Sequence, residues 1–145
     1  MKIVTMCRGG NVRSVAAKMV LNRYFGHEVI AIGYDNTNNE TKKLVFDWAD
    51  RIVIMSMEIW DLALASHDAE YGHKFNILDV GQDVWGDPFK VDLQLKIFNL
   101  LIEETDFAYH INTYEKAAPI AAEIMSRIAD YKQKIKSRNP TDTAL

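Results

Sequence analysis

Short, continuous apolar runs alternate along this chain with segments whose apolar residues recur every three or four positions. A continuous run is typical of a fully buried strand, whereas the three-four spacing places an apolar stripe on one side of a helix. The runs predict strands over residues 2–6, 29–32, 51–55 and 75–80. Alternating strands and helices predict an α/β fold, a three-layer sandwich in which helices flank a mainly parallel four-stranded sheet.

The helical segments fall between and after the predicted strands. The spacing of their apolar residues predicts helices over residues 14–26, 40–49, 59–65 and 93–101. A longer stripe over 117–135 predicts a last helix, whose apolar face either packs on the sheet or binds a partner. Packing is the expectation, since such a face is usually part of a core. Residues 1–138 are expected to form a single domain, and 139–145 a frayed tail.

Composition narrows the classes of partner. The chain has 145 residues, with 17 basic and 20 acidic side chains and a net charge of −3. That length suits one domain with a real core, and the charge argues against binding to nucleic acid or an anionic membrane surface. No apolar run approaches the roughly 20 residues of a membrane span, and we expect no signal peptide. The single cysteine excludes an intrachain disulfide and a Cys-rich zinc site, and it indicates a cytoplasmic location.

That cysteine begins the segment between the first predicted strand and the first predicted helix. The segment reads Cys7-Arg8-Gly9-Gly10-Asn11-Val12-Arg13-Ser14. Glycines let successive backbone amides turn inward, and the positive end of a helix dipole favours an anion there. Arg13 offers a planar fork of donors for a tetrahedral oxyanion, and the same environment favours a reactive thiolate on Cys7. Ser14 either places a hydroxyl near the sulfur or caps the helix. A buried, inert cysteine is the alternative, but it gives Arg13 and the glycines no role.

The pattern Cys-x5-Arg-Ser after an N-terminal strand resembles the phosphate-binding loop of low-molecular-weight protein tyrosine phosphatases. The resemblance implies that Cys7 is a nucleophile that forms a phosphocysteine intermediate, that Arg13 holds the transition state and that Ser14 stabilises the thiolate. This chain has Gly10 where the family usually has an asparagine that braces the loop, and Val12 where a second cysteine is frequent. Arg8 replaces a usually apolar residue and is expected to add positive potential at the mouth of the pocket.

Such a reaction needs an acid to protonate the leaving group. The family supplies it from an Asp-Pro-aromatic motif, and this chain contains Asp87-Pro88-Phe89. Asp87 is therefore the predicted general acid and base, with Asp83 and Asp79 as fallback candidates. The same dipeptide also suits a turn or a helix start, which is compatible with catalysis. Phe89 would form a wall against an aromatic leaving group.

The predicted function is phosphomonoester hydrolysis, most simply that of a cysteine-dependent protein tyrosine phosphatase. Its substrate would be a phosphotyrosine protein or a small phosphomonoester, and neither a metal nor another cofactor is expected. A thiol-based arsenate reductase needs further cysteines, and a phosphocysteine carrier needs neither Arg13 nor an Asp-Pro acid. The remaining alternative is a non-catalytic module that binds phosphate or phosphotyrosine. The predicted substrate-binding residues, besides Cys7, Arg13 and Asp87, are Arg8, Gly9, Gly10, Asn11, Val12, Ser14 and Phe89.

Overall fold

Four parallel strands form the centre of the molecule. The structure is a computed structural model that describes residues 1–107, 118–127 and 133. The strands are β1 (Lys2–Cys7), β2 (Glu28–Gly33), β3 (Arg51–Ile54) and β4 (Phe75–Ile77). They lie in the order β2-β1-β3-β4, and every neighbouring pair is parallel. Because β1 is central and buried over all but its first residue, it can be apolar on both faces.

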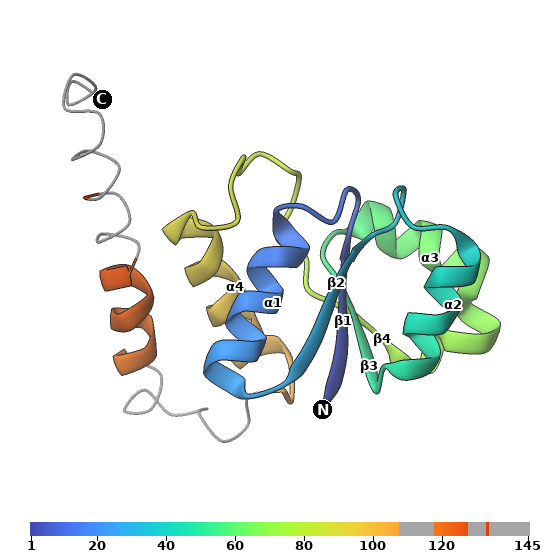
Figure 1. The fold of residues 1–145 in the computed structure, drawn as a ribbon, viewed down its shortest axis with the longest axis horizontal. Coiled ribbons are helices and arrows are strands. Elements are labelled where there is room, and N and C mark those ends of the chain that lie inside the picture. Colours follow the sequence, from blue (N-terminus) through green and yellow to red (C-terminus); the bar gives the residue numbers. More distant parts are fainter. Residues whose placement is uncertain (108–117, 128–132, 134–145) are drawn as a thin grey trace.

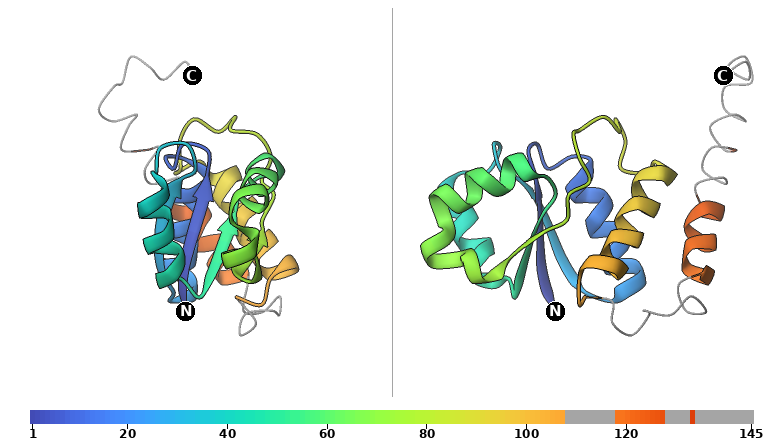
Figure 2. Two further views of the ribbon diagram at one scale, coloured as in Figure 1. Left: turned by 90° about the vertical axis from the view of Figure 1, so that its right-hand side faces the viewer. Right: turned by 180° about the vertical axis from the view of Figure 1, so that it is seen from behind.

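Helices cover both faces of this sheet (Figures 1 and 2). One layer holds α1 (Arg13–Phe25) and α4 (Val91–Glu104), and the other holds α2 (Asn39–Trp48) and α3 (Met57–Tyr71). A short 3-10 helix, η1 (Gly72–Lys74), follows α3. The predicted α/β sandwich with a four-stranded parallel sheet is therefore confirmed.

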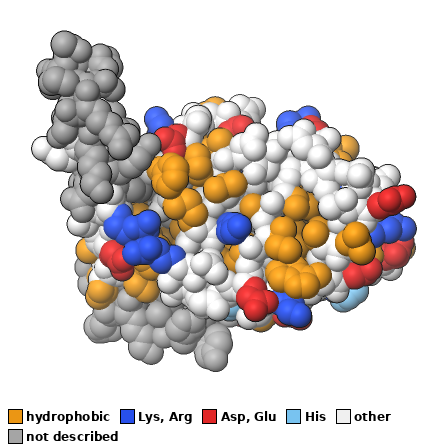
Figure 3. Space-filling model, viewed as in Figure 1, with side chains coloured by type: hydrophobic (Ala, Val, Ile, Leu, Met, Phe, Trp, Pro, Cys, Tyr) orange, Lys and Arg blue, Asp and Glu red, His pale blue; other side chains and the backbone are white. Residues whose placement is uncertain are grey.

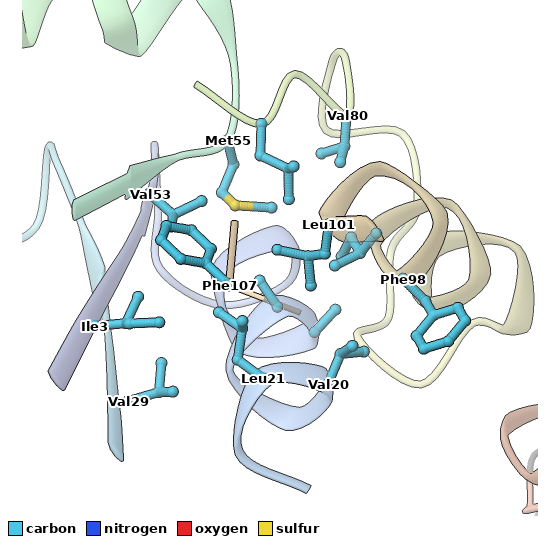
Figure 4. Packing of buried hydrophobic residues seen from close by; sticks show 14 of the residues in the cluster. Ile3, Val20, Leu21, Val29, Val53, Met55, Val80, Phe98, Leu101 and Phe107 are labelled. Carbon is cyan, nitrogen blue, oxygen red and sulfur yellow. The ribbon is translucent and has the colours of Figure 1, made fainter. Parts of the chain in front are cut away.

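The alternation of side chains along each strand divides the core between the two layers. Ile3 of β1 packs in the cluster under α1 and α4, whereas the next residue, Val4, packs in the cluster under α2 and α3. Figure 4 shows the first cluster, in which Val53 and Met55 from the β3 region approach Leu101 of α4. The sheet is thus buried on both faces, as its continuous apolar strands predict.

Two elements differ from their predicted lengths. Strand β4 ends at Ile77 rather than at residue 80, although Leu78 and Val80 stay buried. The apolar run continues because these residues pack into the core after the regular ladder has ended. Helix α3 extends beyond the predicted 59–65, and its second half buries only His67 and Tyr71. Because so few apolar residues mark this half, the apolar pattern underestimates the length of a helix whose other side faces solvent.

The described part of the predicted last helix packs against the rest of the molecule. Residues 118–127 are helical, and Ile124 is fully buried in the cluster under α1 and α4. Arg127 Nη1 donates to the hydroxyl of Tyr24 at 2.9 Å. This part of the stripe therefore packs on helix α1 rather than directly on the sheet. The rest of the predicted helix over 117–135, and the predicted tail over 139–145, lie outside the described residues.

The surface carries charges of both signs. On the face seen in Figure 3, basic and acidic side chains lie close to one another in small groups, and apolar side chains lie between these groups. Within the described residues, no helix is both long and apolar enough to cross a membrane.

Candidate active site

Cys7 is the last residue of β1, and the following loop leads directly into α1. In a parallel sheet, the carboxyl ends of all strands lie at one edge, so the connections that follow them converge there. At this edge the loop after β1 meets the connections that follow β2, β3 and β4 (Figure 1). The Cys7 side chain is only 2% exposed and forms part of the core cluster.

Two polar groups contact the sulfur of Cys7. The thiol donates a hydrogen bond to Ser14 Oγ at 3.2 Å, and the backbone N–H of Gly10 donates to the sulfur at 3.2 Å. Ser14 is itself fully buried, and its carbonyl accepts a hydrogen bond from Thr5 Oγ1 at 2.8 Å. A hydroxyl and an amide N–H around one sulfur are groups that can stabilise a thiolate by donating to it.

Ser14 does not cap the helix. Helix α1 starts at Arg13, its N-cap is Val12, and no side chain bonds to the cap position. Of the two roles considered for Ser14, the structure therefore shows the hydroxyl beside the sulfur. The first turn of α1 also holds no acidic residue, which leaves the positive end of its dipole uncompensated by a carboxylate of its own.

Arg13 lies buried between the loop and the connection that follows β4. Its side chain is almost completely covered, with the residue 4% exposed, and Nη1 donates to the carbonyl of Gly81 at 2.8 Å. Its Nε is buried and has no hydrogen-bond partner among the described residues. A buried N–H group of a cation without an acceptor is costly, so an anion at this position would be strongly favoured.

Arg8 forms two ion pairs. Nη1 lies 3.1 Å from Asp35 Oδ2, and Nη2 contacts Glu58 Oε1. The Arg8 side chain is 45% exposed, so each of these pairs is weakened by solvent. The positive potential expected from Arg8 is thus partly offset by two carboxylates.

The rest of the loop consists of small or half-exposed residues. Gly10 has φ of 75°, which only glycine adopts without strain, and Gly9 and Val12 are half-buried whereas Asn11 is exposed. Of the sequence-predicted loop residues, the structure therefore brings Gly10 and Ser14 to the Cys7 sulfur.

A cavity of about 400 Å³ opens beside the two arginines. A volume of this size suits a small ligand or a side chain with a phosphoryl group. Cys7 and residues 9–12 do not form its wall, which reaches the loop through Arg8 and Arg13. The residues that line the cavity are Arg8, Arg13, Ser56, Met57, Glu58, Asp79, Gly81, Gln82 and Asp83.

The Asp-Pro-aromatic segment lies on the same connection between β4 and α4. Asp87 is half-buried, and its Oδ1 accepts a hydrogen bond from the N–H of Phe89 at 2.7 Å. The carbonyl of Pro88 accepts from Nε2 of the buried Gln94 at 3.0 Å, which ties the segment to α4. Asp87 is not part of the cavity wall, whereas the two fallback carboxylates, Asp79 and Asp83, are. Phe89 is 41% exposed.

Five residues of the wall have no counterpart in the sequence prediction: Gly81 and Gln82 after β4, and three residues after β3. Ser56, Met57 and Glu58 follow β3 directly and cap or begin α3, where Ser56 Oγ accepts from the N–H of Ile59 at 3.4 Å. Because β3 is the neighbour of β1 in the sheet, this connection lies beside the loop after β1. Their position immediately after a predicted buried strand is the signal that marks such residues.

Within the described residues, no group of three or more His, Cys, Asp and Glu side chains has the arrangement of a metal site. The acidic residues of the cavity share its wall with the two arginines, and Cys7 is not part of that wall. The chemistry available here is therefore that of a thiol, a buried guanidinium, backbone amides and carboxylates.

Fold and site together define an α/β protein with a buried cysteine at the amino end of a helix. No protein-family model matches the chain, and no curated protein does. Among solved structures, it is similar to the YwlE arginine phosphatase from Geobacillus stearothermophilus, at 15% identity and a TM-score of 0.46, over 95% of this chain and 96% of that chain. It is also similar to a YwlE mutant from Bacillus subtilis, at 14% identity and a TM-score of 0.48, over 86% of this chain and 99% of that chain.

Both of these proteins belong to the low-molecular-weight protein tyrosine phosphatase family, which is the family that the cysteine segment resembles.

Proposed function

We propose that this chain is a cysteine-dependent phosphatase in which Cys7 is the nucleophile. One observation carries the proposal: the buried guanidinium of Arg13 has an Nε without a hydrogen-bond partner among the described residues. Arg13 is the first residue of α1, and the loop that precedes α1 covers the Cys7 sulfur. The oxygens of a phosphoryl group would supply the missing acceptor for Arg13 Nε, and they would also accept hydrogen bonds from the backbone N–H groups of the loop. The anion site and the nucleophile would thus be adjacent.

The reaction would proceed in two steps. The thiolate of Cys7 attacks phosphorus in line, a sulfur–phosphorus bond forms, and the bond from phosphorus to the leaving atom breaks. The leaving atom is the oxygen of a phosphoester or the nitrogen of a phosphoarginine. A carboxylic acid gives its proton to that atom. Its carboxylate then accepts a proton from water, which attacks phosphorus, releases inorganic phosphate and restores the thiolate. Arg13 and the loop amides stabilise the charge on the equatorial oxygens in both steps.

Asp87 is our proposed acid and base. Hydrogen bonds from Phe89 and Gln94 support its Asp-Pro turn, which precedes α4 on the same connection as the wall residue Asp83. Asp83 is the second candidate, because its residue lines the cavity directly. Asp79 is the third, although its Oδ1 already accepts the N–H of Gly81 at 2.9 Å.

The substrate class follows from the cavity wall. Exposed Met57 beside the cavity, and exposed Phe89 on the connection that carries Asp87, offer apolar surface for the ring of a phosphotyrosine side chain. Glu58, Asp79 and Asp83 place three carboxylates around the same space, which favours a cationic leaving group such as the guanidinium of a phosphorylated arginine. We therefore propose a phosphorylated protein side chain as the substrate, with phosphotyrosine and phosphoarginine as the two forms to compare.

The test measures release of the leaving group from an aryl phosphate by the wild type and by single variants. Cys7→Ser should abolish turnover, and Asp87→Asn should lower it by about 10²- to 10⁴-fold while leaving a burst from the first step. Asp83→Asn and Asp79→Asn are measured in parallel, so that the largest loss identifies the acid. Asp92→Asn, an exposed change in the first turn of α4, controls for removal of a nearby charge.

Undiminished turnover by Cys7→Ser would rule out the mechanism. If the wild type binds a phosphotyrosine peptide and never hydrolyses it, the chain is the non-catalytic binding module instead. Rates on phosphotyrosine and phosphoarginine peptides of the same sequence then decide between the two substrates.

A further inference from the structure

The connection that follows β2 binds the backbone of the Cys7 loop over three successive residues. The N–H of Tyr34 donates to the carbonyl of Cys7 at 2.8 Å, and the N–H of Asp35 donates to the carbonyl of Arg8 at 3.1 Å. The third contact comes from a side chain and not from the backbone: Nδ2 of Asn36 donates to the carbonyl of Gly9 at 2.9 Å. These contacts extend the parallel pairing of β1 and β2 beyond the end of both strands.

The last of the three contacts acts on a peptide group that also touches the sulfur. The carbonyl of Gly9 and the N–H of Gly10 belong to one planar peptide unit, and they point in opposite directions because the unit is trans. Asn36 holds the carbonyl end, and the N–H end donates to Cys7 Sγ at 3.2 Å. The orientation of that N–H toward the sulfur is therefore coupled to the hydrogen bond from Asn36.

Packing on the other side prevents the same segment from shifting as a whole. A side-chain carbon at Gly33 would lie 2.5 Å from the carbonyl carbon of Gly9, so the two backbones touch without space for a side chain. Glycine on both sides of the Gly9–Gly10 peptide would by itself permit many backbone angles, so the hydrogen bond from Asn36 and the contact of this peptide with Gly33 together oppose its rotation. A rotated peptide would point its carbonyl oxygen at the sulfur and at any bound anion, and would repel both.

We propose that Asn36 is a positioning residue that fixes the Gly9–Gly10 peptide with its N–H toward Cys7 and the anion. This inference rests on the proposed function, because it assumes that the loop receives a phosphoryl group. Asn36 itself is exposed on the connection between β2 and α2 and does not line the cavity. It would therefore act on the sulfur through the peptide only, and not by touching the substrate.

The test uses inorganic phosphate as the probe and alkylation of Cys7 by iodoacetate as the signal. Protection of the single cysteine at increasing phosphate concentrations gives a dissociation constant without any turnover. Asn36→Ala should weaken phosphate binding about fivefold, the effect of one hydrogen bond. Asn36→Asp should weaken it further, since a carboxylate would face the carbonyl of Gly9, and Asn36→Gln, which keeps the donor, should recover part of the loss.

Asn38→Ala is the matched control. Asn38 is two residues further along the same exposed connection and caps α2, where its Oδ1 accepts the N–H of Thr41 at 2.8 Å. Losing this cap should lower the free energy of unfolding by about 1 kcal/mol, while phosphate binding stays that of the wild type. Loss of stability alone would thus be separated from loss of loop position.

The outcomes distinguish the two proposals. If phosphate protects Cys7 equally in the wild type and in Asn36→Ala, the positioning role is wrong and the phosphatase proposal stands. If Asn38→Ala weakens phosphate binding as much as Asn36→Ala, the effect is one of general stability and the positioning role is again overturned. If phosphate fails to protect even the wild type, the proposed anion site is wrong, and the inference falls with it.

Discussion

Gly10 and Gly33 meet backbone to backbone: a side-chain carbon on Gly10 would lie 2.5 Å from the amide nitrogen of Gly33. The loop that covers Cys7 is therefore pressed against the end of β2 at a position that no other residue type fits. This contact links the shape of the candidate site to the pairing of two neighbouring strands.

A methyl group at Gly33 should be strongly destabilising. In Gly33→Ala the new carbon would lie 2.5 Å from the carbonyl carbon and 2.6 Å from the carbonyl oxygen of Gly9, both rigid backbone atoms. We expect a loss of about 1 to 3 kcal/mol in the free energy of unfolding, measured with urea. Gly9→Ala is the control, since its new carbon would meet only side-chain atoms at 3.8 Å and 3.9 Å. Equal stability of Gly33→Ala and the wild type would contradict the close contact.

Removal of the Ser14 hydroxyl should slow the reactions of Cys7. Ser14 Oγ lies 3.2 Å from the sulfur inside the core, so Ser14→Ala deletes one of the two polar contacts that support the sulfur anion. Alkylation by iodoacetate at neutral pH should slow by about fivefold, the effect of one hydrogen bond. Thr5→Val serves as a control, because it removes the hydrogen bond to the Ser14 carbonyl and leaves the hydroxyl in place. If both variants react alike, the hydroxyl has no particular role at the sulfur.

Release of Arg8 from its ion pair with Glu58 should tighten the binding of anions. Glu58→Gln removes one carboxylate from the cavity wall and one partner of the half-exposed Arg8 guanidinium. The dissociation constant of inorganic phosphate should fall by about two- to fivefold, as expected for an exposed charge pair. The gain should shrink at 0.5 M salt, where the Debye length is only a few ångströms. An unchanged affinity at low salt would show that Arg8 and Glu58 do not influence the anion.

The Tyr71 phenol should ionise at a higher pH than an ordinary tyrosine. Its hydroxyl donates to Asp47 Oδ1 at 2.7 Å, and this hydrogen bond, together with burial and the Asp47 charge, raises the pKa of Tyr71 to about 12. The contribution to stability is therefore present below pH 10 and is lost as the pH rises toward 12. Phenolate absorbance, compared between the wild type and Tyr71→Phe, isolates this group. Asp47→Asn should move the ionisation to lower pH, and a Tyr71 phenol that ionises at the ordinary tyrosine pKa of about 10 would contradict the expectation.

His67 should make the protein less stable in acid. Burial, and then the nearby positive charge of Lys42, lower the pKa of His67, with a smaller opposing effect from Glu70 and a further lowering by Lys43. A histidine held neutral in the folded state contributes stability above its ordinary pKa of about 6.5, and that stability is lost as the pH falls through the lowered pKa.

The measurement for His67 is the free energy of unfolding between pH 7.5 and pH 5. The ring packs edge-on against Phe46 at a centroid distance of 5.5 Å, so His67→Phe keeps an aromatic ring there and removes the titration. The variant should lose less stability than the wild type over this range. Parallel curves for the two proteins would show that His67 does not titrate differently in the folded state.

The apolar pattern predicted most of the fold because each element carries its own signal. The run that forms β1 and the spacing that forms α1 are local, and both were found within one or two residues of their ends. Helix α3 was predicted too short because its second half has few buried residues, of which His67 is polar. Local sequence cannot show that such a half-polar segment gains its stability from neighbours in space.

The loop after Cys7 was also visible in the sequence, since Arg13 and Ser14 follow it at fixed spacing and Gly10 permits a left-handed backbone. What the sequence determined by itself was therefore this list of groups and the strand and helix on either side of them. The tertiary structure decided what surrounds them: Glu58 faces Arg8, Gly81 binds Arg13, and Asn36 holds the peptide next to the sulfur. These partners lie 27 to 68 positions away along the chain, and only the strand order β2-β1-β3-β4 brings their connections to one edge of the sheet. That order arises from packing and hydrogen bonding between strands, which no local pattern of residues contains.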